Sequence, residues 1–236
     1  MSEILDNQKN KIIQLLNEKS VMKQDVFRNT ISVFELLKEC VNEISTSLIS
    51  EVKTIDNRIG IEVLGTSHFS AQLKVAGDLL EFFMHTNVFE FDKSHGMYKT
   101  SYIKQNNNNS YCGIINVYNF LSDSFKYNRS EDLGYLVCRI FINREKHFFI
   151  EAKGTLGIKY AMFSNEPLTK ELLLEIINEL IIYAISFDLY TPPYDTVKVV
   201  SVNEIQEKIN SINLRTGKRL GYGTSNSVND DTNLYI

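Results

Sequence analysis

The stretch with the clearest chemical potential runs from His147 to Gly157 and reads HFFIEAKGTLG. Its apolar beginning predicts a β-strand, and the strand leads into Glu151-Ala152-Lys153. A strand that ends in Glu-x-Lys can present a carboxylate and a lysine to a phosphodiester. Because Mg²⁺ binds carboxylate oxygens and stabilises charge on phosphoryl oxygens, these residue types fit metal-dependent cleavage of nucleic acid.

The predicted elements around this stretch are also informative. From residue 111 to residue 202 the pattern predicts a strand, a strand preceded by an acidic residue, a strand with Glu-x-Lys, a helix and a strand. This order resembles the core of the PD-(D/E)xK nucleases over less than half of the chain. In that family an aspartate and the Glu bind Mg²⁺, and the lysine helps to position the attacking water. The resemblance implies these roles for Glu151 and Lys153, with Asp132 as the nearest upstream carboxylate.

The pairing of the Glu-x-Lys strand with the preceding strand can be predicted from alternation. Apolar stripes must face each other, which puts Ala152 opposite Cys138 and Glu151 opposite Arg139. Such a cross-strand ion pair contributes roughly 0.2–1 kcal/mol on an exposed face and requires no catalytic explanation. Asp132 lies seven residues before Arg139 in the sequence, more than about 20 Å along an extended strand. The sequence therefore favours a half-exposed structural strand, with a Mg²⁺-dependent nuclease or its inactive remnant as the alternative.

A second candidate site combines aromatic and basic residues on either side of the run Asn106 to Asn109. Aromatic rings can stack on bases while cations contact phosphates, so single-stranded nucleic-acid binding is a further alternative. Residues 93–129 hold five basic residues against one acidic residue. A solvated loop anchored to a sheet would use the same residue types. The candidate binding residues are Tyr98, Lys99, Tyr102, Lys104, Lys126, Tyr127 and Arg129.

Composition narrows the functional classes. A net charge of −4 and an isoelectric point near 5.7 give no overall attraction to nucleic acid or anionic lipid.

The three cysteines are widely spaced in apolar surroundings, which predicts buried thiols and no metal site. No glycine-rich phosphate loop leads from a strand into a helix, so we expect no cofactor. The chain start lacks a secretory signal and the most apolar segment, residues 172–185, is too short to cross a bilayer, so we expect a cytoplasmic protein without a membrane partner.

Residues 1–57 contain no proline or glycine, and their apolar positions recur at helical spacing. We predict a pair of helices, residues 3–18 and about 23–55. The second is about 45 Å long at 1.5 Å per residue, which exceeds a small domain. Its apolar seam packs either on the chain's own sheet or first helix, or on a partner protein or second copy. The interface candidates in this seam are Phe27, Ile31, Phe34, Leu37, Val41, Ile44 and Leu48.

From residue 58 the apolar period changes to two, which predicts an antiparallel sheet of six or seven strands. The expected strands are residues 61–66, 68–76, 79–91, 111–121, 133–143 and 147–153, with 157–163 as a possible seventh. A two-residue loop at Gly77-Asp78 would place Leu73 opposite Phe82 and Lys74 opposite Glu81. Residues 92–110 are polar and predict an exposed, mobile loop.

The C-terminal part begins with a helix predicted from an N-cap at Thr169 to about Leu189, covering the sheet as the core helix. The two prolines that follow end this helix. A short strand, residues 196–202, and an amphipathic helix, residues 203–212, come next. The polar tail from Arg215 is predicted to be disordered or ordered by a partner.

Together these patterns predict an α+β protein. The expected organisation is an N-terminal helical region (1–57), a domain of antiparallel sheet and core helix (58–203), and a C-terminal helix with a flexible tail (204–236). The expected function is a non-catalytic interaction or ligand-sensing module that assembles with itself or a partner through the long N-terminal helix.

Overall fold

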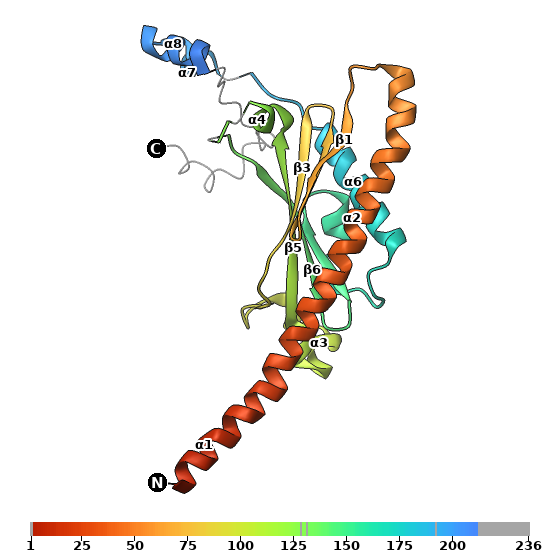
Figure 1. The fold of residues 1–236 in the computed structure, drawn as a ribbon, viewed down its shortest axis with the longest axis vertical. Helices are drawn as coiled ribbons and strands as arrows, with labels where there is room; N and C mark the ends of the chain where they lie inside the picture. Colours follow the sequence, from red (N-terminus) through yellow and green to blue (C-terminus); the bar gives the residue numbers. More distant parts are fainter. Residues whose placement is uncertain (1, 128, 131, 192, 212–236) are drawn as a thin grey trace.

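The computed structural model describes residues 2–127, 129–130, 132–191 and 193–211. The fold is α+β, as predicted: a long N-terminal helix packs on a seven-stranded antiparallel sheet, and a shorter helix lies beside it (Figure 1). The N-terminal part of the long helix extends beyond the sheet.

The N-terminal region is one continuous helix and not the predicted helical pair. It consists of α1 (Ser2–Leu15), a π-helical turn η1 (Leu16–Ser20) and α2 (Val21–Ile55). The backbone is helical on both sides of the π turn, with φ −62° and ψ −38° at Leu15 and φ −59° and ψ −47° at Val21. No glycine or proline interrupts these residues, so nothing in the local sequence forces the chain to turn back.

The sheet contains seven strands in the order β1-β2-β3-β5-β6-β7, with the short β4 also paired to β5. The strand predicted for residues 79–91 is divided into β3 and β4. The possible strand at residues 157–163 was wrong, because the chain leaves β7 through Gly154 at φ 74° and forms the short helix α5 (Thr155–Lys159). The strands are β1 (Ile61–Thr66), β2 (Ser70–Val75), β3 (Asp78–Met84), β4 (Phe89–Glu90), β5 (Tyr111–Leu121), β6 (Tyr135–Asn143) and β7 (Phe148–Ala152).

The β2–β3 hairpin differs in register from the prediction. Leu73 pairs with Leu80 and Lys74 with Leu79, two residues away from the expected partners. Ala76 adopts a positive φ of 53°, so the two-residue loop is Ala76-Gly77 and starts one residue earlier than predicted. Because the shift is two residues, every side chain keeps its predicted face. The expected partner of Lys74, Glu81, is hydrogen-bonded by Gln72 (2.6 Å).

One face of the sheet is covered by α2 and α6 (Lys170–Ile185), which pack together in the main core. Thr169 caps α6 as predicted, since its side chain accepts a hydrogen bond from the Leu172 amide (3.4 Å). The helix ends at Ile185, four residues before its expected end, and shares the core with α2. All three cysteines are buried, as predicted.

The apolar seam of α2 is used inside the chain. Of the predicted interface residues, Phe34, Leu37, Val41 and Ile44 are buried in the main core, and Phe27, Ile31 and Leu48 pack partly buried against it. The seam therefore packs on the chain's own sheet and on α6. The four buried side chains are not available to a partner, which corrects their assignment as interface residues.

The opposite face, called here the far face, is covered at its two ends. At one end lies the cap, residues 91–110, which contains η2 (Gly96–Lys99), α3 (Ser101–Gln105) and η3 (Asn107–Ser110). Met97 and Ile103 of the cap are buried against Phe141 and Phe149. The expectation of an exposed loop was wrong, because these two apolar residues form a second core with the far face. At the other end lies α4 (Ser122–Lys126), where Phe125 packs edge-on against Phe120 of β5.

The C-terminal residues form α7 (Tyr194–Val197) and α8 (Val202–Ser211). The strand expected at residues 196–202 is absent from this described segment. It stands away from the sheet, so its apolar residues have no neighbouring strand to pair with (Figure 1). The amphipathic helix begins at Val202, one residue from its predicted start. The tail from Arg215 lies outside the described residues.

The helix α2 comes close to the backbone of β5 at Gly113. A Cβ atom at this position would lie 2.0 Å from Thr30 Oγ1 and 2.8 Å from Thr30 Cβ. We expect Gly113→Ala to lower the free energy of unfolding by about 1–3 kcal/mol, because α2 must move off the sheet. Urea unfolding followed by circular dichroism measures this change. Gly96→Ala is the control, since its Cβ would meet no atom within 4 Å, and equal stability of the two variants would contradict the close contact.

Candidate functional site

Glu151 lies on β7 directly opposite Arg139 on β6, as alternation predicted. The two side chains form an ion pair, and both are partly exposed. Nε2 of His95, from the cap, lies 4.0 Å from Oε1 of Glu151. The carboxylate therefore faces a permanent cation where a metal-binding aspartate would be needed.

Asp132 does not join Glu151. It lies in the connection between α4 and β6, where its side chain is 1% exposed and accepts a hydrogen bond from Ser124 Oγ (2.6 Å). Arg129 Nη1 lies 3.6 Å from the same carboxylate. Lys153 is exposed in the bend after β7. Within the described residues, no group of three or more His, Cys, Asp or Glu side chains could hold a metal ion. The geometry thus gives the nuclease alternative no second carboxylate at Glu151.

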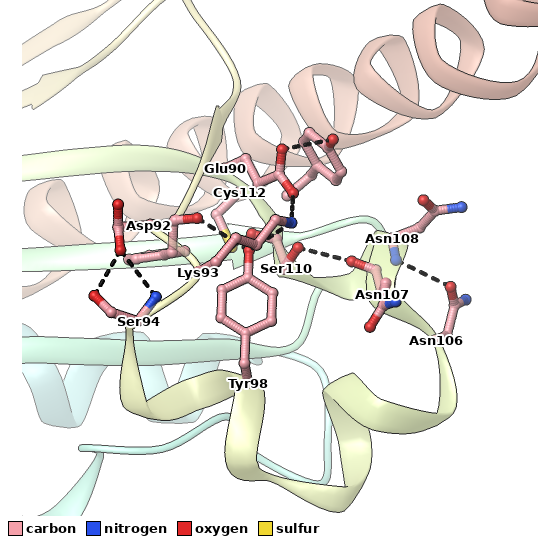
Figure 2. Close-up of polar contacts among 12 residues, drawn as sticks. Glu90, Asp92, Lys93, Ser94, Tyr98, Asn106, Asn107, Asn108, Ser110 and Cys112 are labelled. Carbon is pink, nitrogen blue, oxygen red and sulfur yellow. Dashed lines mark hydrogen bonds and ion pairs between the residues drawn. The ribbon is translucent and has the colours of Figure 1, made fainter.

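The polar residues at the start of the cap are paired with one another (Figure 2). Asp92 accepts hydrogen bonds from the amide (2.8 Å) and hydroxyl (2.5 Å) of Ser94, which hold the pKa of Asp92 below its usual range. Glu90 forms an ion pair with Lys93, and this contact lowers the pKa of Glu90. The Tyr111 hydroxyl also donates to Glu90 (2.8 Å). These carboxylates hold the cap together and are already occupied.

The asparagine run serves the same structural purpose. Asn106 Oδ1 accepts a hydrogen bond from the Asn108 amide (3.1 Å), which caps η3. Ser110 Oγ donates to the Asn107 carbonyl (2.7 Å), as Figure 2 shows. Asn109 is buried and donates to Glu145 (3.3 Å). Asparagine and serine favour such local caps because their side chains can bond nearby backbone groups.

Tyr102 anchors the cap to the turn between β6 and β7. Its hydroxyl donates to Glu145 Oε2 (2.6 Å) and accepts a hydrogen bond from Asn143 Nδ2 (2.8 Å). Its ring stacks on His147 with 5.2 Å between centroids. Burial, together with the Glu145 carboxylate, raises the pKa of Tyr102. Both the ring and the hydroxyl are therefore engaged within the fold.

The candidate nucleic-acid-binding residues fall into two groups at opposite ends of the far face. Tyr98, Lys99, Tyr102 and Lys104 belong to the cap, whereas Lys126, Tyr127 and Arg129 belong to the α4 end. The 11-residue strand β5 connects the two ends, which corresponds to more than about 30 Å. Lys99 and Lys104 are exposed, but the Tyr98 hydroxyl donates to the Phe91 carbonyl (3.0 Å). The structure does not bring the seven residues into one site.

No known protein family, curated protein or solved structure matches this chain. Its function must therefore be inferred from its own surfaces.

A set of exposed apolar side chains lies on the segment formed by α1, the π turn and the first residue of α2. On a helix, Leu5, Ile12 and Leu16 lie on one side, and Ile4 and Leu15 flank them. We call the exposed apolar residues of this segment the α1 stripe. Its members are Ile4, Leu5, Ile12, Ile13, Leu15, Leu16 and Val21, each between 51% and 65% exposed. The sequence identified this helix as amphipathic but did not show that its apolar side has no partner among the described residues.

The π turn determines where the stripe points. Leu5, Ile12 and Val26 are separated by multiples of seven, so an uninterrupted α-helix would place them on nearly the same side. A π turn takes up about one extra residue and so rotates α1 by roughly 100° relative to α2. The α1 stripe is therefore turned away from the face that α2 buries on the sheet. Among the described residues, no helix is both long and apolar enough to span a membrane.

Removing the Tyr102 hydroxyl tests whether it anchors the cap. We expect Tyr102→Phe to lower the free energy of unfolding by about 1–3 kcal/mol, because it leaves the buried Asn143 amide without this acceptor. The raised pKa means that the fold favours the neutral phenol, so this contribution is present below about pH 10 and is lost at higher pH. Urea unfolding at pH 7 and pH 10.5 measures both effects. Tyr194→Phe, at a 79% exposed position, is the control and should change neither value.

A double-mutant cycle of Glu151→Ala and Arg139→Ala tests the structural interpretation of the Glu-x-Lys strand. We expect a coupling free energy of about 0.2–1 kcal/mol, as for other exposed cross-strand pairs. We also expect Mg²⁺ titration, followed by amide NMR, to give no shifts localised at Glu151. Localised shifts that disappear in Glu151→Ala would contradict this interpretation and support the nuclease alternative.

Proposed function

We propose that this protein is a non-catalytic interaction module that associates with a second copy of itself through the α1 stripe. The observation that carries the proposal is the exposure of the whole stripe on a helix that extends beyond the body (Figure 1). An exposed apolar patch of a few hundred Å² on a folded protein is frequently an interaction site.

The size of the stripe indicates the strength of the association. A fully buried Leu or Ile side chain corresponds to on the order of 100 Å² of apolar surface. Seven side chains that are about half exposed therefore offer a few hundred Å² on each copy. Stable complexes bury about 800 Å² on each partner, so the stripe alone supports a weak or transient dimer.

The charge of the segment favours a protein partner over a membrane surface. Residues 2–20 carry three acidic and three basic side chains, so their net charge is zero. Amphipathic helices that bind anionic membranes are rich in Lys and Arg on the polar face. A neutral helix gains no such attraction and meets no net repulsion from a second copy.

The polar groups elsewhere agree with a non-catalytic role. Glu151, Asp132 and Tyr102 each have partners within the fold and come from three separate places in it. Catalysis needs a nucleophile, base or metal held together at one reacting position. The described residues offer an exposed apolar helix instead.

The experiment compares Ile12→Asp with Asn7→Asp, which lies on the side of α1 away from Leu5, Ile12 and Leu16. Both changes add one negative charge and have similar effects on helix propensity. We expect the wild type and Asn7→Asp to dimerise weakly and Ile12→Asp to be monomeric, because its carboxylate would be buried in the dimer. Sedimentation equilibrium up to about 1 mM, which detects association as weak as about −4 kcal/mol, measures this difference. A monomeric wild type, or equal dimerisation of both variants, would contradict the proposal.

A further inference from the structure

A groove of about 900 Å³ opens at the α4 end of the molecule. One wall is the far face of the β1–β2 hairpin with Leu64, and the other is formed by Leu121, by α4 with Phe125, and by Arg129. Leu189, just after α6, also lines it. These three apolar side chains are 45%, 40% and 50% exposed, so the groove has an apolar lining that is open to solvent.

The chain itself carries a helix with exposed apolar residues at the same end of the molecule. In α8, Val202 and Ile205 are 72% and 41% exposed, and Ile209 continues the same spacing in the sequence. All the described side chains of α8 are exposed. Figure 1 shows α7 and α8 standing off the body at the same end as α4. An amphipathic helix with apolar residues at this spacing is the usual occupant of an apolar groove.

We propose that α8 docks by its Val202–Ile205 side into the groove of its own chain. The connection from Leu189 to Val202 contains residues 190–201, which can span about 40 Å when extended. Because Leu189 belongs to the groove wall, the tether starts at the site. A tether of this length gives an effective concentration in the millimolar range, which favours the chain's own helix over a second copy.

The charged groups that line the groove are largely paired with one another. Lys74 forms an ion pair with Glu62, and Arg129 lies between Asp123 and the buried Asp132. Docking of α8 therefore depends on its apolar side chains and on the tether.

The sequence contains no tryptophan, so one introduced Trp reports on α8 alone. The full chain would be studied with Ile205→Trp and, as a matched control on the polar side of α8, Asn203→Trp. We expect the fluorescence of Ile205→Trp to be blue-shifted relative to Asn203→Trp, because only the first ring enters the groove. The shift should not depend on protein concentration, since the contact lies within one chain.

A second substitution locates the contact. Leu64→Asp in the groove should remove the blue shift of Ile205→Trp, and Phe125→Ala should reduce it without adding a charge. Ile158→Asp, at an 84% exposed position that does not line the groove, should leave it unchanged. Equal emission from the two Trp variants, or a shift insensitive to Leu64→Asp and Phe125→Ala in folded protein, would overturn the proposal. A shift that grows with protein concentration would replace it with docking on a second copy.

Discussion

The packing of α2 across the sheet is the interaction on which the rest of the structure depends. Phe34, Leu37 and Val41 join the helix to the strands and to α6 in one core, and Gly113 allows the backbone of β5 to come close to Thr30. Because this packing uses the apolar seam of α2, the helix has no comparable face left for a partner along that length. The exposed apolar side chains of the N-terminal helix lie instead on the α1 segment, which extends beyond the end of the sheet.

On the far face, the described residues with catalytic potential are paired within the fold and lie apart from one another. Alternation along paired strands brings Arg139 to Glu151, and the connection after α4 holds Asp132 against Ser124. The cap uses its carboxylates and amides to close its own short turns and helices. A carboxylate that already has a short hydrogen-bonded or ionic partner gains less from an added ligand.

Two of the exposed apolar surfaces in the described part of the chain, the α1 stripe and α8, differ in how a partner can reach them. The α1 stripe belongs to a helix that continues through the π turn into α2 and extends beyond the sheet. A connection of twelve residues joins α8 to the groove wall, and it is long enough for α8 to reach the groove of its own chain. The first surface is therefore suited to contact between molecules and the second to contact within one.

The sequence by itself determined the features that depend on local pattern. Apolar alternation gave the β6–β7 register and the Arg139–Glu151 pair, and residue type gave the Thr169 cap. Tertiary structure decided the rest, because periodicity shows that a face is apolar but not what covers it. In the folded chain the α2 seam is buried in the main core, and the cap packs over Phe141 and Phe149. The α1 stripe stays exposed. The positive φ of Ala76 and the π turn at Leu16–Ser20 could not be predicted from the apolar pattern either. Each changes the alignment of the residues that follow, but neither is marked by a distinctive residue type.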